Sequence, residues 1–128
     1  FLLLASGLGR YLTSCANVRD SNVAMARWLA PRLPAASVLA VNDIDPEDVI
    51  SVILTSTPDL VSCYPATAAR LAGLKDVPLL SAQEVAVPGA MPRVVRVMAH
   101  VESDLPRRKV QHVYLRGTEG LRQATAND

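Results

Sequence analysis

Cysteine, aromatic residues and an excess of charge of either sign are all scarce in this 128-residue sequence. The two cysteines, Cys15 and Cys63, have no cysteine or histidine nearby at metal-ligand spacing, so neither a zinc site nor a disulfide framework is indicated. A reducing cytoplasm is therefore the expected location. A net charge of +1 and few aromatic rings argue against a nucleic-acid partner. Every apolar run is shorter than the roughly 20 residues of a membrane span, so no membrane partner is expected.

Half of the residues are hydrophobic. Together with the length, this composition predicts a single domain over residues 1–128. A chain of this size can bury a sufficient core without disulfides. We expect residues 1–20 to form an atypical N-terminal segment and residues 123–128 to form a frayed tail. The apolar start of the chain has no basic segment before it and is followed by Arg10, so a signal peptide is not expected.

Helical and strand patterns alternate along the chain, which predicts an α/β unit. Apolar positions at helical spacing predict one helix in the first quarter of the chain, and a second, shorter helix is predicted over residues 66–72. The residues that mark the ends of these helices are Ser21 or Asn22, Pro31, Pro34, Pro65 and Gly73.

Four segments have strand character. Residues 49–55 are nearly all apolar, which is typical of a strand covered on both faces, and Pro78 in the segment 77–80 indicates an edge or the start of a strand. In the strand predicted over 93–101, Arg96, Met98 and His100 share one face. The last predicted strand is 110–115, and residues 57–59 form a turn.

Standard catalytic motifs are missing. The segment Gly7-Leu8-Gly9 lacks the third glycine of a dinucleotide fingerprint, no serine or cysteine stands in a nucleophile elbow, and His100 and His112 have no sequence-local metal partner. Neither a metal nor an organic cofactor is therefore expected. The candidates that remain are Arg70, Glu84, Arg96, Tyr114 and Arg122. Composition alone would make them ordinary surface or core-edge residues.

The order and spacing of several segments between Pro46 and Arg122 are more specific. These segments are Thr57-Pro-Asp-Leu60, Tyr64-Pro-Ala66 with Ala69-Arg70, Val77-Pro-Leu-Leu-Ser-Ala-Gln-Glu84, Arg93-Val-Val-Arg96-Val, His112-Val-Tyr-Leu115 and Leu121-Arg122. Together they resemble the trimeric, barrel-like class of monofunctional chorismate mutases. The resemblance covers about six-tenths of the chain.

This resemblance implies an α+β fold: a mixed sheet of five to six strands with helices on one side, three copies of which form a pseudo-barrel. It implies an isomerase of the shikimate pathway that converts chorismate to prephenate for phenylalanine and tyrosine biosynthesis. The rearrangement is unimolecular, so the protein needs to select a chair-like conformer and to stabilise a polarised transition state, and it needs no cofactor. The expected partners are chorismate and two further copies of the chain, with sites between subunits.

The resemblance also assigns roles. Arg96 meets the negative charge on the ether oxygen, Glu84 accepts a hydrogen bond from the ring hydroxyl, and Tyr114 donates its phenol to a substrate carboxylate. Guanidinium groups suit a substrate with two carboxylates because their rigid fork binds a carboxylate in a bidentate manner. The further residues expected to line the substrate site are Tyr64, Arg70, Leu80, Ser81, Ala82, Gln83, Leu121 and Arg122.

Two features depart from the family pattern. Thr67 stands at a substrate-binding position where other members have a charged residue, which should weaken electrostatic attraction of the substrate. The family's N-terminal Arg-Gly-Ala segment has no counterpart in residues 1–20, where Arg10 is the candidate for its arginine by approximate position. Two alternatives therefore stay open: a catalytically impaired trimeric homologue that binds a small dicarboxylate, and a deaminase-like protein of similar architecture.

Overall fold

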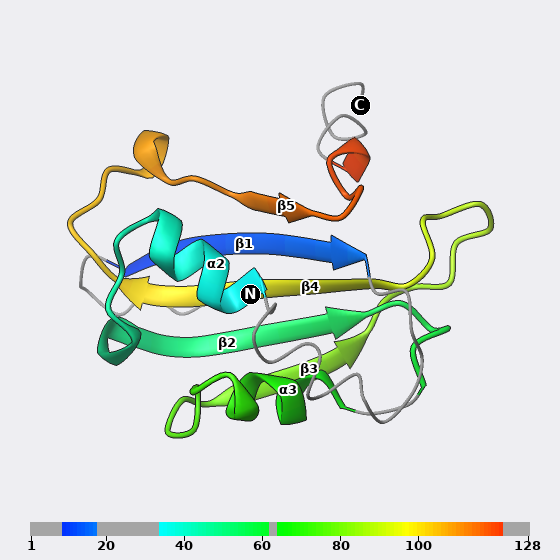
Figure 1. Ribbon diagram of the computed structural model, residues 1–128, viewed down its shortest axis with the longest axis horizontal. Helices are drawn as coiled ribbons and strands as arrows, with labels where there is room; N and C mark the ends of the chain where they lie inside the picture. Colours follow the sequence, from blue (N-terminus) through cyan, green and yellow to red (C-terminus); the bar gives the residue numbers. More distant parts are fainter. Residues whose placement is uncertain (1–8, 18–33, 62–63, 122–128) are drawn as a thin grey trace.

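The centre of the fold is a mixed β-sheet. The computed structural model describes residues 9–17, 34–61 and 64–121. Its strands are β1 (Gly9–Asn17), β2 (Val49–Ser56), β3 (Leu79–Gln83), β4 (Val94–Glu102) and β5 (Val113–Leu115). These described strands form one five-stranded sheet in the order β3-β2-β4-β1-β5 (Figure 1). The three inner strands pair antiparallel. At the two edges, β3 pairs parallel with β2, and β5 pairs parallel with β1.

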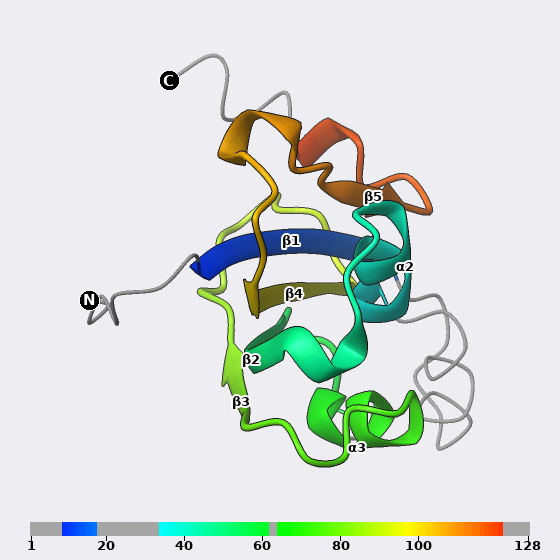
Figure 2. The ribbon, with the colours of Figure 1, turned by 90° about the vertical axis from the view of Figure 1, so that its left-hand side faces the viewer.

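Within the described ranges, two short α-helices cover one face of the sheet. Helix α2 (Pro34–Val41) lies over β1 and β4, and α3 (Pro65–Leu71) packs beside β2 and β3. Figure 2, turned by 90° from Figure 1, shows both helices on the same side of the sheet. Two 3-10 turns, η2 (Pro46–Asp48) and η3 (Arg107–Lys109), lie before β2 and β5. None of the helices described is long and apolar enough to cross a membrane.

The hydrophobic core lies between the sheet and these helices. Along β4, Val95, Val97, Ala99 and Val101 are all buried in this core, whereas the alternate residues from Arg96 onward are more exposed; Val94, at the start of the strand, is buried as well. The alternation follows from the two-residue period of a strand. Arg96, Met98 and His100 consequently share one face, as the sequence predicts, and it is the face that the described helices leave open.

Several predicted elements are confirmed with small shifts at their ends: the strands β2 and β4, the turn after β2, and helix α3. Pro65 is the first residue of α3, and Gly73 follows its end with a φ of 108°. The Val77–Leu80 segment leads into β3, which is an edge strand, as its proline indicates.

Other predictions are wrong in the chain as described. Pro34, predicted to mark the end of a helix, is the first residue of α2, a helix that the sequence pattern did not predict; proline also suits the first turn of a helix. The last strand covers only 113–115 of the predicted 110–115, since the backbone N–H and carbonyl of Gln111 are bonded to the Asn42 side chain. The helix predicted after Ser21 and the tail 123–128 lie outside the described residues.

Strand β2 is buried on one face only. Val49, Val52 and Leu54 belong to the core, whereas Ile50 is 46% exposed and Ser51, Ile53 and Thr55 are half-buried. The prediction that this strand is covered on both faces is therefore wrong for the single chain. The half-exposed side chains belong to the open face of the sheet, which also carries Arg96.

Candidate active site

A row of register partners crosses the open face of the sheet. Thr55 of β2 pairs with Ala82 of β3 on one side and with Arg96 of β4 on the other. Arg96 in turn pairs with Cys15 of β1, and Cys15 pairs with Tyr114 of β5. Because neighbouring strands lie about 4.8 Å apart, the backbones at Arg96 and Tyr114 are separated by about 10 Å. The topology thus brings two of the three predicted catalytic residues to the same level of one face.

Glu84, the third predicted catalytic residue, joins this row from the end of β3. Its backbone N–H donates to the carbonyl of Ser56 at 2.9 Å, which extends the parallel pairing of β3 with β2. Its carboxylate forms an ion pair with Arg96, with 2.7 Å between Arg96 Nε and Glu84 Oε1. The Thr55 hydroxyl donates to the same Oε1 at 2.6 Å. Both distances are short, as is typical of hydrogen bonds to a charged group.

The terminal nitrogens of Arg96 stay available for a ligand. The ion pair uses Nε, and within the described part of the chain no protein acceptor is recorded for the other N–H groups. The Arg96 side chain is 45% exposed, and that of Glu84 is 19% exposed. The site therefore presents a fixed cation with unused donors in a planar fork.

Arg96 and Glu84 line a cavity of about 620 Å³, here called the Arg96 cavity. Its walls include the turn after β2, the loop between β3 and β4, and Leu121 from the C-terminal turn. Leu121 was expected to line the substrate site, and it lies in this wall. Arg122, the residue expected beside it, is outside the described residues. Tyr114 is on the same face of the sheet but is not among the residues that line this cavity.

The turn after β2 is tied firmly to the start of β4. Thr57 exchanges backbone and side-chain hydrogen bonds with Val94, and the Asp59 carboxylate accepts from the backbone N–H of Arg93 at 2.9 Å. Arg93 has a φ of 57°, a left-handed conformation that is uncommon for residues other than glycine. These bonds fix the wall of the Arg96 cavity only three residues before Arg96 itself.

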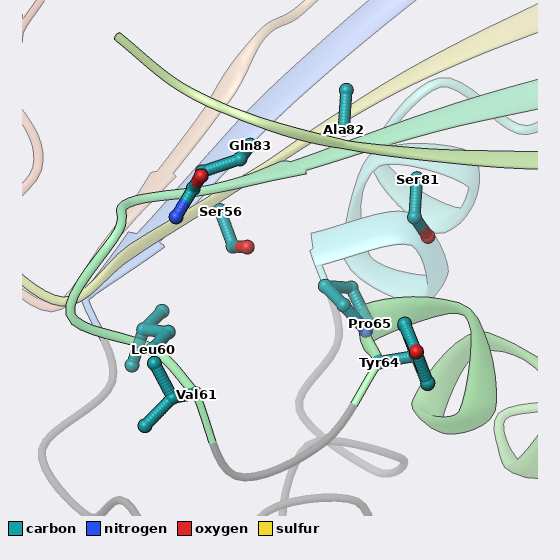
Figure 3. A pocket seen from close by; sticks show the side chains of 8 residues that line it. All are labelled: Ser56, Leu60, Val61, Tyr64, Pro65, Ser81, Ala82 and Gln83. Carbon is teal, nitrogen blue, oxygen red and sulfur yellow. The ribbon is translucent and has the colours of Figure 1, made fainter. Parts of the chain in front are cut away.

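A second cavity of about 460 Å³, here called the Tyr64 cavity, lies beside the opposite face of β3. Tyr64, Ser81, Ala82 and Gln83 of the predicted site all line it. In Figure 3 Ser81 points toward Tyr64 and Pro65 of α3, whereas Ala82 points to the other side of the strand. Tyr64 is 78% exposed, so its ring forms an open rim. The predicted substrate residues are thus divided between two cavities of one chain.

The other predicted residues lie apart from both cavities. Thr67 and Arg70 are exposed on α3, and Leu80 is 60% exposed on β3. Arg10 of β1 pairs with Val101 of β4. The β1 residue that pairs with Arg96 is Cys15, five positions along the strand from Arg10. At the rise of a strand this is about 17 Å, so the register does not bring Arg10 to Arg96 within one chain.

Sequence reasoning missed Thr55. A threonine at the end of an apolar strand is common, so the sequence around Thr55 gives only a weak signal. The role of Thr55 becomes visible from the strand register, which places it beside Arg96. Among the described residues, no group of three or more histidine, cysteine, aspartate or glutamate side chains could hold a metal ion.

Comparisons with known proteins identify the family of the chain. The family model for chorismate mutase type I matches residues 18–125. The chain is 54% identical to chorismate mutase AroH of Thermus thermophilus over 76 residues, which are 59% of this chain and 62% of that protein. It is 40% identical to chorismate mutase AroH of Bacillus subtilis over 86 residues, which are 66% of this chain and 68% of that protein. The match therefore spans about three-fifths of the Thermus relative.

A solved structure extends the similarity to the fold. A chorismate mutase from Clostridium thermocellum superposes with a TM-score of 0.80 and 31% sequence identity, covering 87% of this chain and 98% of the other. The family match includes the β3 and β4 segments that carry Glu84 and Arg96. On these grounds, the chain belongs to the chorismate mutase type I family.

Proposed function

We propose that this chain is a chorismate mutase that converts chorismate to prephenate in the biosynthesis of phenylalanine and tyrosine, in the cytoplasm. The observation that carries the proposal is the Arg96–Glu84 ion pair at the edge of the Arg96 cavity, in which the terminal nitrogens of Arg96 stay available. The family match and the identity to two chorismate mutases support the choice of substrate.

The reaction suits a site built from fixed charges. One ether carbon–oxygen bond breaks while one carbon–carbon bond forms within the same molecule, so no proton, electron or water enters the balance. Negative charge builds on the ether oxygen as its bond breaks, and the fixed guanidinium of Arg96 would stabilise it. The Glu84 carboxylate would accept a hydrogen bond from the ring hydroxyl, and the Tyr114 phenol would donate to a substrate carboxylate. Holding the chair-like conformer supplies the remaining acceleration.

The same proposal includes a homotrimer with sites between subunits. The predicted site residues of one chain line two separate cavities, one beside β3 and one past its end, which suits a site completed by a neighbouring copy. Strand β3 is at the edge of the sheet, and apolar side chains near it are exposed: Val61, Tyr64, Leu80, Val85 and Val87. A patch of this kind is typical of an interface. Sedimentation analysis of the purified chain tests the assembly, and a monomer at micromolar concentration would contradict it.

The decisive experiment follows the ultraviolet absorbance of chorismate with purified protein and identifies prephenate as the product. Arg96→Lys keeps the charge but loses the fork, and we expect it to lower kcat by about 100-fold or more, as the loss of one preorganised donor does. Arg107→Lys is the matched control: Arg107 is exposed in η3 and lines neither cavity, so its replacement should leave the rate unchanged.

The outcomes separate the remaining candidates. Turnover that depends on Arg96 establishes the mutase. A folded trimer that binds a dicarboxylate transition-state mimic without turnover would instead be the impaired homologue, a candidate favoured by the register position of Arg10 far from Arg96. Indifference to both chorismate and the mimic would point to the deaminase-like alternative.

A further inference from the structure

We infer that Thr55 is a positioning residue that holds the Glu84 carboxylate in its working orientation. The inference rests on the proposed function, because it gives Thr55 its role through Glu84. The Thr55 hydroxyl donates to Oε1 of Glu84 at 2.6 Å, and Arg96 Nε donates to the same oxygen at 2.7 Å. Thr55 is not among the residues that line the Arg96 cavity, so it acts through Glu84 and not on the substrate.

The sheet order explains why a support is needed at this point. Glu84 follows β3 and Arg96 is in β4, but β2 lies between these two strands. The side chains of Glu84 and Arg96 therefore have to meet over β2. Thr55 is the β2 residue paired with Arg96, and its hydroxyl meets the carboxylate along this path. Without it, a flexible side chain with three rotatable bonds would be held at one end by a single ion pair.

The two donors also decide which carboxylate oxygen is free. Both hydrogen bonds end on Oε1, and among the residues that the structure describes no donor is recorded for Oε2. An ionised carboxylate accepts at both oxygens, so Oε2 retains its full capacity for a donor from a ligand. Two donors from adjacent strands thus fix one oxygen and leave the other for the ring hydroxyl of the substrate.

Thr55→Val tests this role directly. Valine is β-branched like threonine and suits a strand equally well, so the substitution removes the hydroxyl and keeps the shape. We expect kcat/KM for chorismate to fall by about tenfold to 100-fold, the change that follows from losing one hydrogen bond to a charged group. Thr55→Ser retains the hydroxyl and should stay within about threefold of the parent, as a substitution without a lost contact does.

A control and a second pair of variants protect the test against folding defects. Ser51→Ala removes a hydroxyl from the same face of β2, about 13 Å from Thr55 at the rise of a strand, and should leave the rate unchanged. If Thr55→Val does not fold, Thr55→Ser is compared with Thr55→Ala, since these two small residues differ only by the hydroxyl. Urea unfolding establishes which variants are folded.

A double-mutant cycle distinguishes a positioning role from a merely structural one. If Thr55 acts only on the structure, its replacement should change kcat/KM equally with and without the Glu84 carboxylate. In a Glu84→Ala background the hydroxyl has no carboxylate to hold, so Thr55→Val should then change kcat/KM by less than about threefold. Equal effects in both backgrounds, a Thr55→Val enzyme as fast as the parent, or a failure of serine to restore the rate would each overturn the role of Thr55 alone. An inactive parent enzyme would overturn the proposed function, and the role of Thr55 with it.

Discussion

The side chain of Asn42 ties the end of α2 to the segment that leads into β5. Its Nδ2 donates to the carbonyls of Val38 and Gln111, and its Oδ1 accepts from the backbone N–H of Gln111, each at 2.8 Å. The residue is only 7% exposed, so water replaces these bonds poorly if the side chain is removed. At about 1 kcal/mol for each bond, Asn42→Ala should lower the free energy of unfolding by about 3 kcal/mol.

Urea unfolding at a fixed chain concentration measures this loss, because the stability of an assembling protein depends on concentration. With a slope of about 1–3 kcal/mol per molar urea, the midpoint should fall by at least about 1 M. Gln111→Ala is the matched control: Gln111 is exposed and bonds to Asn42 only through its backbone, so its loss should cost less than about 0.5 kcal/mol. An Asn42→Ala chain as stable as this control would refute the reasoning.

Three further substitutions should lower the free energy of unfolding, each measured in the same way. Leu54→Ala opens a cavity at a fully buried position and should cost about 2–5 kcal/mol; a smaller loss would mean that the core collapses around it. Thr118→Val removes a buried hydroxyl that bonds both the N–H and the carbonyl of Leu115, and should cost about 1–3 kcal/mol. An unchanged urea midpoint would contradict this expectation. Gly73→Ala meets no atom within 4 Å but has to adopt a φ of 108°, so about 1–2 kcal/mol is expected and a neutral result would show that the turn relaxes.

Elements with a strong local pattern were predictable from the sequence. From Val95 onward, strand β4 alternates buried residues with more exposed ones, and α3 has a proline at its start and a glycine after its end. Helix α2 was not predictable in this way, because Pro34 suits both the end of one helix and the start of another. Strand β1 is short of β-branched residues, and its place inside the sheet follows from pairing with distant strands.

The candidate site was predictable in its residue types but not in its arrangement. The resemblance named Glu84, Arg96 and Tyr114, and the register brings Arg96 and Tyr114 to one row of the open face. The meeting of the Glu84 and Arg96 side chains over β2 depends on the strand order, which local patterns do not encode. Thr55 was missed for this reason, since it gains its partner only when β2 lies between β3 and β4.

The position of β1 bears on how the chain folds during synthesis. Its partners in β4 lie far along the sequence, from Asn17 with Val94, 77 positions apart, to Gly9 with Glu102, 93 positions apart. Contacts of such separation form slowly, because a long loop has to close before any pairing is gained. While a ribosome makes the chain, β1 therefore waits unpaired until β4 emerges, and a chaperone that shields this early strand would raise the yield of folded protein.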